Sequence, residues 1–356
     1  MSGVWGNKIK LSIFGESHGQ AIGINIDGLE PGISLDIEFI KRELARRAPG
    51  NSELSSPRKE DDSFQILSGF FNGKTTGAPL CAVIHNKGQH SIDYEKTMNL
   101  IRPSHGDYTG FIKYKGFNDY RGGGHFSGRL TAPLVFAGGI CKQILKEKNI
   151  LIGSHIKSIG KIKDKVFDMV NINEVMIKSL NLNNFPVLNS TAALEMKEAI
   201  YIAKQEKDSL GGIIETAVIN IPIGVGEPFF DSFESTLAHL IFSIPAVKGL
   251  EFGAGFEITK IRGSAANDPF YIDRNKIKTS SNNNGGINGG ITNGMPIIFR
   301  VAIKPTPSIG KNQNTVDLNK MGNTQIQIKG RHDPCIVPRA LPVVEAVTAI
   351  TILNLL

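Results

Sequence analysis

The sequence predicts an α+β fold built from antiparallel sheets, and two observations support that class. Segments with the apolar–polar alternation of strands occur in pairs joined by turns, as in hairpins. Helical segments lie between these pairs without the regular strand–helix alternation of a doubly wound parallel sheet. No linker and no repeat period divides the 356 residues, so we expect a single domain over 1–356.

The first half of the chain is predicted to form strand pairs and helices separated by polar loops. The strands alternate apolar and polar residues and cover 9–14, 21–27, 64–69 and 78–85. The helices carry apolar residues at helical spacing and cover about 36–47 and 127–148. Asp36 is a suitable N-cap for the first helix, and Pro49-Gly50 stops it. Residues 51–62 and 102–128 are predicted loops.

The second half contains the same kinds of segment. Its predicted helices cover about 192–207, 233–243 and 341–353. Its predicted strands cover 213–221, 251–262, 296–304 and 325–329. The stretch 279–290, rich in asparagine and glycine, is predicted to be a flexible polar loop.

The composition is that of an ordinary soluble globular protein. Hydrophobic residues make up 40% and charged residues 21%, and no apolar run is long enough for a membrane span. The N-terminal residues 1–10 lack the apolar core of a signal peptide. The scattered cysteines, 3 in all, are too few for a disulfide framework or a metal site. We therefore expect a cytoplasmic protein with no membrane or metal partner.

The net charge of +7 fits a nucleic acid, a small polyanion, or lysines that serve only solubility. The arginines help to decide, because many stand in or beside loops marked by glycine and proline: Arg46, Arg47, Arg58, Arg102, Arg121, Arg129, Arg331 and Arg339. Aromatic residues, at 7%, are not interleaved with them as single-stranded nucleic-acid binding requires. A pocket for small anions is therefore favoured over a nucleic-acid surface.

Three glycine-bearing loops each contain a histidine: Gly15-Glu16-Ser17-His18-Gly19, Arg102-Pro103-Ser104-His105-Gly106-Asp107 and Gly330-Arg331-His332-Asp333-Pro334-Cys335. Glycine lets backbone N–H groups approach an anion, and imidazole can transfer a proton near neutral pH. Any one of the histidines could be structural, but together they predict one polar pocket for a multiply charged substrate. Asp333, held extended by Pro334, suits a base or an orienting role.

The segment Arg121-Gly122-Gly123-Gly124-His125-Phe126-Ser127-Gly128-Arg129 leads into a predicted helix. Backbone N–H groups at a helix N-terminus favour phosphate or carboxylate. The glycines alone indicate a tight turn equally well, but His125, Ser127 and the two arginines favour an anion site. Residues 304–308 and 282–290 would by themselves indicate no more than a stiff turn and a surface loop.

Further motifs complete the pattern: Phe14-Gly15-Glu16-Ser17-His18-Gly19, Arg47-Ala48-Pro49-Gly50, Asp119-Tyr120-Arg121-Gly122-Gly123-Gly124, Ala246-Val247-Lys248-Gly249, Gly285 to Gly290 and Lys304-Pro305-Thr306. With the histidine loops, they occur over nearly the whole chain in an order that resembles the chorismate synthase family. Each motif is weak alone, whereas the set is specific.

The resemblance implies a β-α-β sandwich of antiparallel sheets with helices between them, internal pseudo-symmetry, and a homotetramer. It implies the 1,4-anti elimination of phosphate from 5-enolpyruvylshikimate 3-phosphate to give chorismate, in the shikimate pathway of aromatic amino acid biosynthesis. Reduced FMN is required without net redox change, because the flavin lends electron density as phosphate leaves and then recovers it. NADP is also associated with the family. We see no reductase-like domain, so an external flavin reductase is the expected source of reduced FMN.

The resemblance also assigns roles. His18 would protonate the departing phosphate, His105 would protonate reduced flavin, and Asp333 would act with flavin N5 in proton removal. The residues that would hold substrate are Ser17, Arg47, Ser127, Arg129 and Arg339. The residues that would hold FMN are His125, Phe126, Ser127, Ala246, Gly289, Lys304, Pro305, Thr306, Pro307, Ser308 and Arg331.

The chain departs from the family pattern at several positions. His125 and Phe126 stand where many members have an arginine and a small residue, Glu53 replaces a frequent arginine, and Pro245 replaces a common asparagine. We expect His125 to donate to an oxygen of FMN or substrate; the alternative is a moved loop in which Ser127 and glycine N–H groups take over. A phosphate-ester hydrolase without flavin is one alternative function, and a nucleic-acid-binding protein is another.

Overall fold

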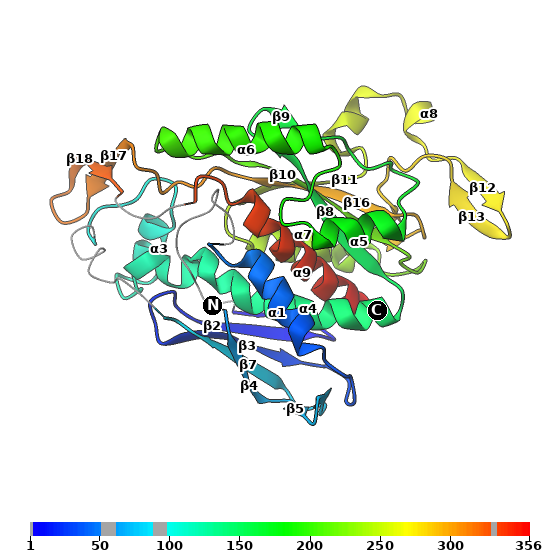
Figure 1. Ribbon diagram of the computed structural model, residues 1–356, viewed down its shortest axis with the longest axis horizontal. Helices are drawn as coiled ribbons and strands as arrows, with labels where there is room; N and C mark the ends of the chain where they lie inside the picture. Colours follow the sequence, from blue (N-terminus) through cyan, green and yellow to red (C-terminus); the bar gives the residue numbers. More distant parts are fainter. Residues whose placement is uncertain (1–2, 51–61, 88–97, 329–332) are drawn as a thin grey trace. The chain divides into compact units, whose positions relative to one another are not determined.

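The computed structural model describes residues 3–50, 62–87, 98–328 and 333–356 (Figure 1). The chain forms two compact units whose segments interleave in the sequence. Unit 1 contains residues 1–137, 198–210 and 305–336, and unit 2 contains residues 138–197, 211–304 and 337–356.

Unit 1 is built on a five-stranded sheet in the order β1-β2-β3-β7-β4. The strands are β1 Val4–Trp5, β2 Lys10–Gly15, β3 Ala21–Asp27, β4 Phe64–Ser68 and β7 Leu80–His85, and every pairing is antiparallel. Ile22, Ile24 and Ile26 of β3 are buried, whereas Asn25 between them is exposed, so β3 buries one face of the sheet. The strands predicted in the first half are confirmed.

Helix α1 of unit 1 begins where the sequence predicts. Helix α1 covers Ile37–Arg47, and the Asp36 side chain accepts a hydrogen bond from Phe39 N at 2.9 Å, as an N-cap does. The sequence did not predict these other short elements of unit 1: β5 Phe70–Phe71, β6 Lys74–Thr75, α3 Asp107–Lys113, the 3₁₀ turns η1 Arg121–Phe126 and η2 Gly128–Leu130, and β17 Asn312–Asp317. Strand β17 pairs with β18 Gly322–Gln327, which overlaps the predicted strand 325–329.

Unit 2 contains a second five-stranded antiparallel sheet, in the order β11-β16-β10-β8-β9. Its strands are β8 Leu151–Ile159, β9 Ile162–Lys163, β10 Gly212–Ile219, β11 Val247–Phe252 and β16 Ile297–Ile303. Helix α5 Glu174–Leu182 packs on β8, with Ile177 and Leu180 buried against Ala217 and Ile298. The predicted α+β class with antiparallel sheets is confirmed.

Helix α9, Val337–Leu355, is the core helix of unit 2 and contacts β8 and helix α7 Phe233–Ser243 (Figure 1). It is long and apolar enough to cross a membrane, but 83% of its most apolar stretch is buried inside the protein. Its apolar character therefore fits a core helix. It begins before the predicted residue 341. Pro342 is the sixth residue of the helix, past its first turn, so one intrahelical N–H donor is missing there.

Two helices cross from one unit to the other. Helix α4 covers Thr131–Glu147 and helix α6 covers Ser190–Gln205, close to the predicted 127–148 and 192–207. Smaller elements of unit 2 complete the chain: η3 Phe229–Asp231, η4 Gly255–Lys260, α8 Gly263–Ala266, β12 Phe270–Asp273, β13 Lys276–Thr279, β14 Ile287–Asn288 and β15 Ile291–Thr292.

Two predictions for unit 2 were wrong. The strand predicted over 251–262 ends at Phe252, because Gly253 and Gly255 adopt φ of +56° and +57° and the chain turns into η4. The stretch 279–290 is a packed turn rather than a flexible polar loop. Asn282 is 2% exposed, and its side chain donates to Met169 O and Pro296 O while accepting from Gly286 N. A buried asparagine with these partners fixes the turn.

His155 of β8 is completely buried between two carboxylates in unit 2. Its Nδ1 lies 3.1 Å from Asp164 Oδ2, and its Nε2 lies 2.9 Å from Glu215 Oε2. Burial disfavours the charged imidazolium, but hydrogen bonds and charges from both carboxylates outweigh it and raise the pKa of His155. The same contacts, against the opposing effect of burial, lower the pKa of Asp164 and of Glu215.

The raised pKa predicts a stability that decreases with alkaline pH. The contribution of His155 is fully present below its unfolded value near 6.5 and is lost as pH rises through the higher folded value. We expect the free energy of unfolding to fall across this interval in the wild type and to fall less in His155→Gln. Urea unfolding at several pH values measures this, with His239→Gln on the exposed face of α7 as the control. Parallel curves for wild type and His155→Gln would contradict it.

Candidate active site

His18 lies in a tight turn between β2 and β3 of unit 1. Gly19 N donates to Glu16 O at 3.0 Å and closes the turn. Ser17 attaches this turn to residues 121–129, called the glycine-rich loop below. Its N donates to Gly124 O at 3.1 Å, and its Oγ donates to Arg121 O at 3.2 Å. Segments 104 residues apart in the sequence thus meet beside His18.

Gly122 provides the space that the His18 ring occupies. A Cβ added to Gly122 would lie 2.4 Å from His18 Cδ2 and 2.5 Å from His18 Nε2, and Gly122 has a φ of +60°. Only glycine satisfies both the backbone conformation and this close approach. The first loop glycine therefore positions the imidazole, a role that the sequence did not reveal.

Gly122→Ala is expected to displace the His18 ring and to lower turnover by at least about 10-fold, since small displacements of a catalytic group have large effects on rate. Steady-state kinetics measure the change. Gly263→Ala serves as the control, because a Cβ at Gly263 meets no atom within 4 Å. Unchanged turnover in Gly122→Ala would show that the position of His18 is not set by this contact.

Arg102 of the His105 loop and Arg121 of the glycine-rich loop each bind a carboxylate in or beside their own loop. Arg102 Nε and Nη2 donate to Asp107 at 2.8 and 2.7 Å, and Arg121 Nε and Nη2 each donate to Asp119 at 2.8 Å. Burial opposes ionisation of Asp119, but its bonds with Arg121 and the charge of His18 lower the pKa of Asp119. Asp119 is thus a carboxylate within electrostatic range of His18. Arg102 and Arg121 therefore stabilise their own loops. The sequence had instead suggested that these arginines contact a bound anion.

His105 precedes α3 and reaches a distant segment of unit 1. Its Nε2 lies 2.6 Å from Ser308 Oγ, across 203 residues of sequence. Ser308 is 6% exposed. The structure therefore brings His105 together with the segment Pro305 to Ser308, two predictions that the sequence could not connect.

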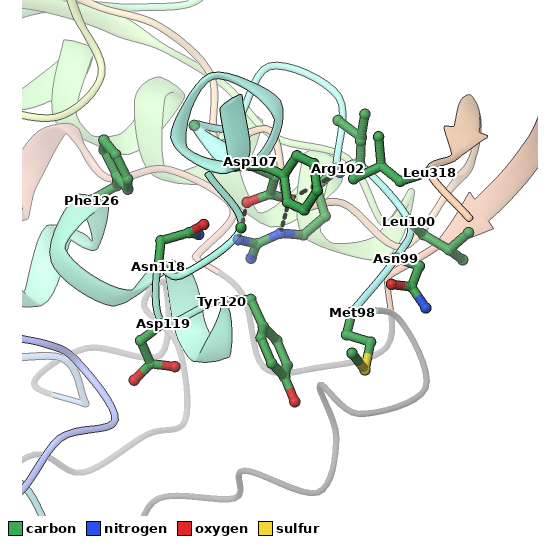
Figure 2. A pocket seen from close by; sticks show the side chains of 15 residues that line it. Met98, Asn99, Leu100, Arg102, Asp107, Asn118, Asp119, Tyr120, Phe126 and Leu318 are labelled. Carbon is green, nitrogen blue, oxygen red and sulfur yellow. Dashed lines mark hydrogen bonds and ion pairs between the residues drawn. The ribbon is translucent and has the colours of Figure 1, made fainter. Parts of the chain in front are cut away.

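A pocket of about 110 Å³ lies in unit 1 between the His105 loop and the glycine-rich loop (Figure 2). The pair of Arg102 and Asp107 forms part of its wall, and Tyr120, Phe126 and Leu318 also line it (Figure 2). Pockets for cofactor-sized ligands occupy roughly 300–1,000 Å³. This pocket by itself is therefore too small for a flavin.

Phe126 packs on α3 rather than in a core. A Cβ added to Gly106 or Gly110 would lie 3.3 or 2.8 Å from its ring, so these glycines make room for it. His125, next to it, is exposed, and its Nδ1 donates to Gly15 O at 2.8 Å. That bond leaves Nε2 to face other partners. His125 thus contacts the chain immediately before the His18 turn.

Arg47 and Arg129, both predicted to hold substrate, share the carboxylate of Asp62. Arg47 is 2% exposed, and its Nε donates to Asp62 Oδ2 at 3.1 Å. Arg129 Nη1 donates to Asp62 Oδ1, and its Nε donates to Asn86 Oδ1 at 3.1 Å. Ser127 Oγ accepts from Arg129 N at 3.3 Å. The structure therefore unites Arg47, Ser127 and Arg129.

Asp62 and Asn86 were missed by the sequence reasoning. Asp62 closes the charged stretch 51–62, and Asn86 follows β7 directly. A carboxylate at the end of a charged stretch of sequence and a polar residue at the end of a strand are weak signals. Their partners become visible only when the strands pair.

Two further predicted site residues, Asp333 and Arg339, belong to different units. Asp333 of unit 1 is half-buried, and the neighbouring Pro334 O accepts from Leu210 N at 2.8 Å. Arg339 of unit 2 is half-buried in the first turn of α9. Predictions for Arg331, His332 and Glu53 fall on residues outside those described.

The remaining predicted FMN contacts are in unit 2. Ala246 adopts a φ of +74°, unusual for alanine, and its O accepts from Lys304 N at 2.9 Å. Gly289, with φ of +62°, lies in the turn between β14 and β15, and a Cβ there would meet no atom within 4 Å. Pro245 is half-buried before Ala246. These positions are open to a ligand or shaped by an unusual backbone.

In the segment that follows β16, Thr306 Oγ1 is buried and has no hydrogen-bond partner among the described residues. A buried hydroxyl without a partner is costly and calls for a ligand or water. Burial and the charge of Lys248 lower the pKa of Lys304, so two cations stand near each other in unit 2. Within the described ranges, no group of His, Cys, Asp and Glu side chains could hold a metal ion.

Comparison with known proteins gives the family. The structure resembles a crystal structure of chorismate synthase with a TM-score of 0.77 and 30% identity, over 99% of this chain and 92% of that chain. The sequence profile of the chorismate synthase family matches residues 9–356. The chain belongs to the chorismate synthase family.

Full-length relatives agree with the family profile. Chorismate synthase from Dehalococcoides mccartyi is 47% identical over 355 residues, which cover 100% of this chain and 96% of the relative. Chorismate synthase from Pyrococcus abyssi is 48% identical over 345 residues, which cover 97% of this chain and 94% of the relative. The chain is a lyase of the shikimate pathway that acts on a phosphate-containing substrate to form chorismate, and its family uses a flavin.

Proposed function

We propose that this lyase carries out the 1,4-anti elimination of phosphate from 5-enolpyruvylshikimate 3-phosphate with reduced FMN and no net redox change. The observation that supports it best is the 2.6 Å contact between His105 Nε2 and Ser308 Oγ. It joins the histidine expected to act on flavin to the segment expected to hold flavin. The Thr306 hydroxyl in the same segment is buried with no hydrogen-bond partner in the described part of the chain, which fits a polar ligand.

His18 is proposed to protonate the departing phosphate. Its ring is held by Gly122, and the carboxylate of Asp119 attracts the imidazolium, the form that can donate a proton. Arg47 and Arg129 are proposed to hold substrate anions. Their shared partner Asp62 keeps two guanidinium groups in one small region without strong repulsion.

His105 is proposed to hold a proton at Nε2 for the flavin, with Ser308 Oγ as the neighbouring hydroxyl. When bound, reduced FMN supplies electron density to the breaking C–O bond and recovers it afterwards. Asp333 is proposed to assist removal of the substrate proton, and Ser17, Ser127 and Arg339 to contact substrate. The residues proposed to contact FMN are His125, Phe126, Ala246, Gly289, Arg331 and the segment Lys304 to Ser308.

The wider setting is also a proposal. We propose that residues 1–356 act as a single catalytic domain, assembled as a homotetramer in the cytoplasm. Reduced FMN would come from an external flavin reductase. NADP would be involved only indirectly, as a source of reducing equivalents.

Dependence on reduced FMN separates this proposal from hydrolysis of the phosphate ester. Phosphate release is measured anaerobically with reduced FMN, with oxidised FMN, and without flavin. Release only with reduced FMN supports elimination. Equal release under all three conditions would instead support a hydrolase that uses the same anion-binding loops.

His105→Ala is expected to lower turnover on the order of 10²–10⁴-fold, the usual range for a lost acid or base. Ser308→Ala is expected to have a smaller effect, because it removes one hydrogen bond of the order of 1 kcal/mol while keeping the imidazole. Steady-state kcat is the measurement, and Ser308→Ala should keep more of it than His105→Ala. A wild-type kcat in Ser308→Ala would separate Ser308 from the proton-transfer step.

A further inference from the structure

The turn that carries His18 is held by Asn86, a residue directly after β7. Asn86 Nδ2 donates to Glu16 O and to Gly19 O, both at 3.0 Å. Its backbone N donates to Gln20 O, also at 3.0 Å. Glu16 and Gly19 are the two ends of the turn, so a single carboxamide binds both ends with both of its N–H groups.

The other end of the same carboxamide binds Arg129. Asn86 Oδ1 accepts from Arg129 Nε at 3.1 Å. The Arg129 side chain is 8% exposed and also binds Asp62, so its position is well restrained. The oxygen and nitrogen of a carboxamide lie in one rigid plane. The guanidinium and the His18 turn are therefore fixed relative to each other by one side chain.

We propose that Asn86 is a positioning residue that sets the His18 proton donor relative to the guanidinium of Arg129. The inference rests on the proposed roles of His18 and Arg129 and requires no contact between Asn86 and substrate. If Arg129 holds a substrate anion and His18 protonates the leaving phosphate, their separation determines whether the proton can reach its acceptor. A displacement of about 1 Å can lower a rate by about 10²-fold.

Asn86→Asp tests this because it preserves the size of the side chain and an acceptor for Arg129. It replaces both donors to Glu16 O and Gly19 O with oxygen lone pairs that repel them. We expect kcat to fall about 10–100-fold, while KM and the equilibrium binding of substrate change less than about threefold. Asn25→Asp, at an exposed position of β3 in the same sheet, is the matched control and should retain the wild-type kcat.

A double variant separates positioning from a general loss of structure. In a His18→Ala background, Asn86→Asp should lower kcat no further, because the donor that Asn86 positions is already absent. Thermal unfolding of each variant shows whether the fold is retained. If Asn86→Asp does not fold, Asn86→Ser, which is neutral and smaller, is used in its place. An additive loss in the double variant, or wild-type kcat in Asn86→Asp, overturns the inference.

The two proposals fail in different ways. Wild-type protein that forms no chorismate from the substrate and reduced FMN would contradict the proposed function before any variant is made. Active wild-type protein with fully active Asn86 variants would contradict only the positioning role.

Discussion

His18→Ala is expected to lower turnover by about 10²–10⁴-fold, the usual loss when a general acid is removed. The reason is local, because the ring lies against Gly122 and near Asp119, in a turn held at both ends by Asn86. Binding of substrate and FMN should weaken far less, since alanine removes the proton donor and leaves the arginines in place. Single-turnover kinetics and equilibrium titration separate the two effects.

His239→Ala, at an exposed position of α7, is the control for loss of a histidine. Turnover in His18→Ala close to that of wild type would remove His18 from the mechanism. A loss confined to substrate affinity would instead make it a binding residue.

Asp62→Ala is expected to lower the free energy of unfolding by about 3–5 kcal/mol, the cost of removing one partner from a buried ion pair. Asp62 has a side chain only 4% exposed and binds both Arg47 and Arg129. Without it, two buried guanidinium groups lose the carboxylate that they share. Substrate affinity should also fall, because repulsion moves the two arginines apart. Urea unfolding and substrate titration measure the two effects.

Asp62→Asn keeps the shape and loses only the charge, so it should fall between wild type and Asp62→Ala in stability. Glu30→Ala, at an exposed carboxylate before Pro31, is the control and should change stability by less than about 0.5 kcal/mol. Stability of Asp62→Ala equal to that of the control would mean that the carboxylate does not hold the two arginines.

Local sequence signals predicted the elements whose causes are local. The Asp36 cap and the Pro49-Gly50 stop defined α1, and apolar spacing gave α7 with its observed bounds, Phe233–Ser243. The long strand β8 was missed, since its residues are buried almost throughout and show no alternation. The 251–262 strand failed because Gly253 and Gly255 break the extended backbone.

The sequence indicated candidate site residues but not the contacts between them. The sequence indicated His18, His105 and the glycine-rich loop, because glycine, histidine and arginine together are typical of anion pockets. It could not pair His105 with Ser308, or Arg129 with Asn86, since those contacts depend on segments 203 and 43 residues apart. The departure at Phe126 also became understandable only when the ring was found against Gly106 and Gly110.

The most direct test of the account is an anaerobic reaction of the protein with 5-enolpyruvylshikimate 3-phosphate and reduced FMN, in which chorismate, phosphate and the flavin spectrum are followed together. The account predicts chorismate and phosphate in equal amounts, over many turnovers per flavin, with the flavin still reduced at the end. Phosphate release without chorismate, or oxidation of one flavin for each product molecule, would contradict it.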